Sequence, residues 1–127
     1  MNIWYISKYA TPSKYFFGTR HFYLSEEWVK NGVDVTVITS NSSHLSNSLP
    51  KFKTLTFVEF INGVRTIWVN TFKSRKSSGL SRIISWIDFD LKLLLFSKKK
   101  TFKSGCNYII ITILNYNIAC MGYFKKI

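Results

Sequence analysis

Apolar residues in the first forty positions form two strand-like runs around one helical pattern. Asn2 to Ser7 is an apolar and aromatic run typical of a buried strand. After a loop, residues 20 to 31 mix apolar with charged side chains, a helical pattern that starts at Thr19 or Arg20 and stops at Gly32. Val33, Val35, Val37 and Ile38 then give a β-branched run with no charge after Asp34. The pattern predicts strand, helix and parallel strand, because βαβ units are almost always of this kind.

The middle of the chain predicts a hairpin and a long helix. Residues 40 to 54 are rich in Ser and Asn and predict a loop, and the runs Phe57 to Ile61 and Val64 to Val69 flank Asn62-Gly63, a strong hairpin signal. Apolar residues then recur at the i, i+3, i+4, i+7 spacing of an amphipathic helix. They are Leu80, Ile83, Ile84, Ile87, Leu91, Leu94 and Leu95. Tyr108 to Leu114 predicts a further strand.

These elements predict an α/β fold: a Rossmann-like open, mostly parallel sheet with flanking helices and one β-hairpin. The 127 residues fit one domain of typical size, and residues 101 to 127 form a weakly patterned tail. Hydrophobic residues make up 46% of the chain, which is enough for a core and argues against intrinsic disorder.

The formal charge of +12 is concentrated toward the end of the chain. Residues 91 to 127 hold seven lysines and no acid, so this part is expected to meet a negative partner. Anionic lipid, a phosphorylated small molecule and nucleic acid carry such charge, and a basic surface that only maintains solubility is the alternative. The chain has no recognised nucleic-acid-binding module, so a nucleic-acid partner is not expected.

Cys106 and Cys120 have neither the spacing nor the histidine partners of a metal site, so they are expected to be free thiols in a reducing compartment. The N-terminal run meets Lys8 too early for a signal peptide. We therefore expect a cytoplasmic protein with no metal and no cofactor.

The candidate site is the loop after the first strand, together with the start of the following helix. In open α/β sheets, ligands bind beyond the carboxyl ends of the strands, and free amides at a helix start attract anions. Gly18 would allow close approach of a ligand, Arg20 could grip a phosphate, and Thr19 and His21 lie beside them. Each residue also has a purely structural interpretation: a turn for Gly18, a solvated side chain for Arg20, packing on the sheet for His21.

Three stretches resemble the beginning of a known family. They are Trp4-Tyr5-Ile6-Ser7-Lys8-Tyr9-Ala10, Gly18-Thr19-Arg20-His21-Phe22-Tyr23-Leu24 and Gly32-Val33-Asp34-Val35-Thr36-Val37-Ile38-Thr39-Ser40. They resemble the N-terminal, acceptor-side domain of bacterial GT-B glycosyltransferases of family 4 (group 1), of the capsule and O-antigen type. The likeness extends to about residue 100. Beyond it, Ser104 to Ile109 replaces a Pro-Asp-Val-Ile strand that family members carry.

The resemblance implies a glycan acceptor, in some enzymes polyprenyl-linked, bound for cell-surface polysaccharide biosynthesis, and a peripheral contact with the inner face of the cytoplasmic membrane. The resemblance assigns a role only to Gly18, Thr19, Arg20 and His21, as the loop and helix start that face the interdomain cleft. It assigns no catalytic residue. Members bind the nucleotide sugar in a second domain, so we expect a truncated transferase that is inactive unless that domain is supplied.

Two ideas about membranes stay open. The stretch from Cys106 to Phe124 has no charged residue and approaches the length of a membrane span, which makes a small basic membrane-associated protein with a C-terminal membrane segment the alternative. Several Asn side chains in this stretch oppose it. The long helix, with Trp86, Phe89, Phe96 and Lys98 to Lys100, could instead lie on an anionic membrane surface, or pack its apolar side within the protein.

Overall fold

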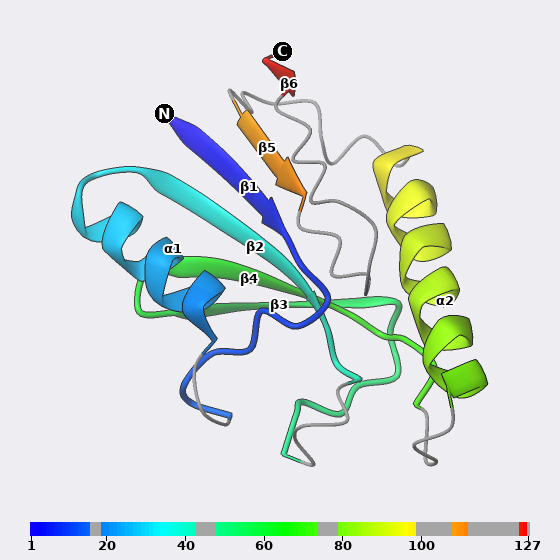
Figure 1. Cartoon of the computed structure of the whole chain (residues 1–127). Helices are drawn as coiled ribbons and strands as arrows, with labels where there is room; N and C mark the ends of the chain where they lie inside the picture. Colours follow the sequence, from blue (N-terminus) through cyan, green and yellow to red (C-terminus); the bar gives the residue numbers. More distant parts are fainter. Residues whose placement is uncertain (16–18, 43–47, 74–78, 99–107, 112–124, 127) are drawn as a thin grey trace.

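The computed structural model describes residues 1–15, 19–42, 48–73, 79–98, 108–111 and 125–126. These residues form an α/β arrangement with one mixed, open sheet and a helix on each side (Figure 1). The sheet order is β3-β4-β2-β1-β5-β6. The elements are β1 (Asn2–Ile6), α1 (Arg20–Lys30), β2 (Asp34–Ser40), β3 (Thr56–Ile61), β4 (Val64–Val69), α2 (Gly79–Lys98), β5 (Tyr108–Ile111) and β6 (Lys125–Lys126).

The predicted opening unit is confirmed: β1 and β2 are parallel and pair Ile3 with Val35 and Tyr5 with Val37. Helix α1 connects them. It ends where expected, since Asn31 is its C-cap and Gly32 follows with a φ of 79°, a conformation that suits glycine. β2 also pairs in parallel with β4, and β1 with β5, so three central pairings of the sheet are parallel.

The predicted hairpin is also confirmed, with β3 antiparallel to β4 around Asn62 and Gly63. Both turn residues have positive φ, 50° and 80°, as a type I′ turn requires. The turn lies against α1, because a Cβ added to Gly63 would come within 2.8 Å of Val29 Cγ1. The Asn62 side-chain amide also donates to Glu26 Oε1 at 2.8 Å. The hairpin tip and α1 therefore brace each other.

Each face of the sheet carries its own apolar cluster. On the α1 face, Phe22 packs among buried residues of β1, β2 and the hairpin. On the opposite face, Phe89 of α2 packs with Trp4, Ile38 and Ile67 of the central strands. The strand residues alternate between these two clusters, so the central strands are covered on both sides, as parallel sheets require.

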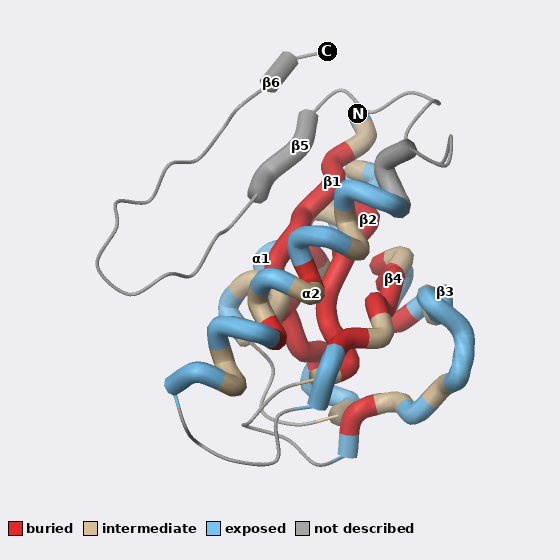
Figure 2. The backbone as a smooth tube through the Cα atoms, turned by 90° about the vertical axis from the view of Figure 1, so that its right-hand side faces the viewer, coloured by how far each residue is buried: buried red, intermediate tan, exposed pale blue. Residues whose placement is uncertain are grey.

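The orientation of α2 differs from that of an ordinary amphipathic helix. Its apolar residues Leu80, Ile83, Ile84, Ile87, Leu91, Leu94 and Leu95 are 47% to 76% exposed. Only Phe89 and the partly buried Leu93 pack on the sheet cluster, and blue segments along α2 in Figure 2 mark the exposed positions. The expectation that this stripe could pack within the described protein is therefore wrong. The expectation that Phe89 faces a membrane is also wrong, because Phe89 is 5% exposed.

Part of the proposed C-terminal membrane segment is a strand. Residues 108–111 pair with β1 as β5, within the predicted run from Tyr108 to Leu114. The rest of that run, and of the stretch to Phe124, lies outside the described residues. Within the part of the chain that the structure describes, neither helix is long and apolar enough to cross a bilayer.

The α1 cluster gives a test of this packing. Phe22→Ala should lower the free energy of unfolding by about 3–5 kcal/mol, because Phe22 is 1% exposed and its loss leaves a cavity against the sheet. Tyr23→Ala is the matched control on the same turn, where the side chain is half exposed, and should change it by only about 0.5 kcal/mol. Urea unfolding measures both, and equal effects would contradict the assignment of the buried face.

Candidate functional site

The predicted loop is tied to the segment that follows β1. Gly18 lies outside the described residues. Thr19 is the N-cap of α1 with an extended backbone, but its side chain makes no cap bond. Its amide and its hydroxyl instead donate to the carbonyl of Thr11, at 3.1 and 3.4 Å. The start of α1 is thereby fixed at the carboxyl end of β1, where an open α/β sheet binds its ligands.

Arg20 and His21 point to different surroundings. Arg20 is exposed, as an anion-binding residue at a helix start should be. His21 is half-buried, and its Nδ1 lies 2.6 Å from the hydroxyl of the buried Tyr5. Burial lowers the pKa of His21, and the neighbouring Arg20 charge lowers it further. His21 therefore packs on the sheet, which was its structural interpretation, and Arg20 alone of this pair faces solvent.

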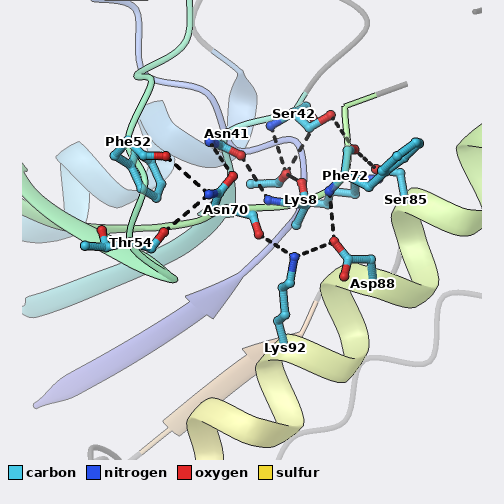
Figure 3. Close-up of polar contacts among 12 residues, drawn as sticks. Lys8, Asn41, Ser42, Phe52, Thr54, Asn70, Phe72, Ser85, Asp88 and Lys92 are labelled. Atoms are coloured by element: carbon cyan, nitrogen blue, oxygen red, sulfur yellow. Dashed lines mark hydrogen bonds and ion pairs between the residues drawn. The ribbon is translucent and has the colours of Figure 1, made fainter. Parts of the chain in front are cut away.

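A second group of polar residues gathers at the ends of β2 and β4 (Figure 3). The side chain of Asn41 joins the two strand ends: its amide donates to Asn70 Oδ1 at 3.2 Å, and its Oδ1 accepts the Thr71 N–H at 3.1 Å. The hydroxyls of Ser40 and Thr71 are also hydrogen-bonded to each other. These groups largely satisfy one another, so they hold the strand ends together rather than present a row of ligand donors.

Helix α2 is attached to the same place by a set of three residues that we call the α2 latch: Ser85, Asp88 and Lys92. Asp88 Oδ2 accepts the Phe72 N–H at 2.8 Å, and Ser85 Oγ donates to the Phe72 carbonyl at 3.1 Å. Lys92 Nζ donates to the Asn70 carbonyl and to Asp88, both at 2.7 Å. The latch satisfies backbone groups just beyond β4 and sets how α2 lies on the sheet.

Lys8 lies two positions after β1, at the same edge of the sheet. The α2 latch does not pair its ammonium with a carboxylate. Its Nζ donates to Ser85 Oγ at 2.7 Å and lies 5.6 and 6.0 Å from the ring centres of Tyr9 and Trp86. Its backbone carbonyl accepts from Thr39 Oγ1 at 3.2 Å. An ammonium has three donors, so one hydrogen bond leaves capacity for a further acceptor.

Partial burial changes the acidity of this lysine. It lowers the pKa of Lys8 to about 8, against an opposing effect from Asp90 and, more weakly, Asp88. Burial likewise raises the pKa of Asp90, while the Lys8 charge lowers it. At neutral pH Lys8 is mostly charged, and a charge held partly out of water gains more from an anionic ligand than a fully solvated one does.

The position of Lys8 in the strand order also favours ligand binding there. β1 lies between β2, which follows it in the chain, and β5, which the chain reaches only after α2, so the strand order changes direction beside β1. Ligands of open α/β sheets bind at such a switch point. The sequence analysis did not single out Lys8 as a ligand-binding residue. The signal that could have found it is a cation directly after the first apolar strand.

The described residues thus define an α/β protein whose open sheet resembles part of a Rossmann fold. Two cations lie beyond the carboxyl end of β1: Lys8, which contacts α2, and exposed Arg20 at the start of α1; we call this region the cationic edge. Comparison with models of known protein families and with curated proteins gave no match. The glycosyltransferase resemblance therefore stays a prediction.

The acidity of Lys8 can be measured. An NMR titration of the lysine side chains should show Lys8 with a midpoint near pH 8, whereas hydrogen bonds to Glu59 and Glu27 raise the pKa of Lys14 and Lys30. Lys8→Arg assigns its resonance. Asp90→Asn should lower the Lys8 pKa further, because the carboxylate that opposes desolvation is gone.

Asp34→Asn is the control for that shift. Asp34 is exposed at the start of β2, at the opposite edge of the sheet, and its removal should leave the Lys8 titration unchanged. A Lys8 that titrates together with the exposed lysines would show that this side chain is not desolvated.

Proposed function

We propose that this chain is the acceptor-binding half of a bacterial GT-B glycosyltransferase of group 1, which acts in cell-surface polysaccharide synthesis. Its acceptor would be a glycan carried on a polyprenyl diphosphate at the inner face of the cytoplasmic membrane. The nucleotide sugar would be bound by a separate C-terminal domain. Two lines of reasoning support the proposal: the resemblance of residues 1 to about 100 to that family, and the cationic edge at the carboxyl end of β1.

The cationic edge is the observation on which the proposal depends most. Thr19 fixes the start of α1 beside the loop after β1, and this arrangement directs the positive end of the helix toward that edge. Exposed Arg20 and partly desolvated Lys8 add two charges. A diphosphate carries several charged oxygens, so it could accept bonds from the helix start and from Arg20, and Lys8 offers a further cation beyond the end of the same strand.

The proposal requires binding of the diphosphate group by these particular residues. Inorganic pyrophosphate and a short-chain prenyl diphosphate serve as probes, titrated into the full 127-residue chain and followed by NMR shifts or calorimetry. Arg20→Ala should weaken binding of both at least tenfold, because a charge-assisted hydrogen bond contributes about 1.5–3 kcal/mol. Lys8→Met should have an effect of similar size for the same reason.

Lys30→Ala is the matched control, because Lys30 is an exposed cation at the opposite end of α1, paired with Glu27. It should leave binding within about twofold, since exposed ion pairs contribute little. If Lys30→Ala weakens binding as much as Arg20→Ala, the attraction is a property of the overall charge of +12 and the proposed site is wrong. The same conclusion follows if neither probe binds.

A further inference from the structure

Helix α2 presents a continuous apolar surface to solvent. The seven residues of this surface, which we call the α2 apolar face, are Leu80, Ile83, Ile84, Ile87, Leu91, Leu94 and Leu95. Each is between 47% and 76% exposed, which amounts to on the order of 700 Å² of apolar surface, against the ~800 Å² that each partner contributes to a standard protein interface. A typical soluble monomer shows no apolar patch this large, so we expect a partner to cover this face.

The spacing of the face favours another helix as that partner. Leu80, Ile84, Ile87, Leu91 and Leu94 follow one another at intervals of four and three residues, the heptad pattern by which helices pack side chains into each other's gaps. Ile83 and Leu95 widen this seam on either side. The pattern runs through the described length of α2 whose side chains are placed.

The charges beside the seam argue against an anionic membrane as the partner. Asp88 and Asp90 flank the apolar face on its two sides, as their positions around the helix show. A helix lying on anionic lipid carries basic residues at these borders. Of the basic residues of α2, only Lys98 at its last position is in line with the seam, and Lys92 is occupied by Asp88 and the Asn70 carbonyl.

The latch makes the face available without cost to the fold. Ser85, Asp88 and Lys92 hold α2 by its polar side to the end of β4, and Phe89 fills the contact with the sheet. A second α2 can therefore approach the opposite side of the helix while these bonds stay in place.

We infer that α2 is the contact surface of a homodimer, in which the α2 apolar face of one copy packs against the same face of a second copy. Such a contact is self-complementary and closed by a two-fold axis. Ile87 is at the middle of the heptad seam, so it lies close to the two-fold axis whether the two helices run parallel or antiparallel. This inference does not depend on the proposed glycosyltransferase function.

Sedimentation equilibrium of the full chain under reducing conditions tests the inference. The unaltered chain should be a dimer at micromolar concentrations. Ile87→Asp should raise its dissociation constant about a hundredfold or more, because each copy would bury an unpaired carboxylate in the seam. Phe60→Asp is the matched control: Phe60 is 71% exposed on the edge strand β3, and the same change there should leave the dimer intact.

Several results would overturn the inference. They are a parent chain that stays monomeric at about 100 µM, which would put the dissociation constant above that concentration, a dimer that survives Ile87→Asp, and an equal loss with Phe60→Asp. A monomer that floats with phosphatidylglycerol vesicles, and does so only with Ile87 intact, would assign the face to lipid and also overturn it.

A cysteine pair keeps the test decisive if Ile87→Asp fails to fold. In a background with Cys106→Ser and Cys120→Ser, Ile87→Cys should form a covalent dimer on mild oxidation, because position 87 of each copy lies next to the two-fold axis. Tyr23→Cys, on the exposed side of α1, should form no covalent dimer under the same conditions. Absence of cross-linking at Ile87 in the folded protein would contradict the dimer.

Discussion

The attachment of α2 to the backbone beyond β4 determines much of this structure. Three polar side chains of the helix bind the amide and the carbonyls of a short segment that no strand partner satisfies. A buried or half-buried backbone group costs free energy when it has no partner, so this set of bonds fixes the rotation of the helix about its own axis. Its apolar side is thereby directed outward, and Ser85 is brought to the ammonium of Lys8.

The same constraint explains which features the sequence could predict. Local patterns identified β1, α1, β2 and the Asn62-Gly63 hairpin, because alternation, a glycine helix stop and a two-residue turn act within a few positions. The apolar stripe of α2 also predicted a helix correctly. It could not tell which side of that helix meets the sheet, because the deciding bonds come from Ser85, Asp88 and Lys92, polar residues that look solvated in a sequence.

The candidate site shows a similar division. Its location at the carboxyl end of β1 follows from the strand–helix–strand order, and the sequence therefore led to Thr19, Arg20 and His21. Arg20 and His21 differ in exposure because the hydroxyl of Tyr5, sixteen positions before His21, is hydrogen-bonded to the His21 imidazole. Lys8 depends on Ser85 and Trp86, which the chain brings back only after three further strands. Such long-range pairings cannot be read from spacing.

The brace between the hairpin tip and α1 has a consequence for how the chain folds. A two-residue turn lets β3 and β4 pair within microseconds, whereas the parallel pairing of β4 with β2 must first close a long loop. The contacts of Gly63 with Val29 and of Asn62 with Glu26 join the preformed hairpin to a helix made earlier in the chain. These contacts reduce the loss of chain entropy in the parallel pairing of β4 with β2. The turn therefore favours the ordering of the central strands.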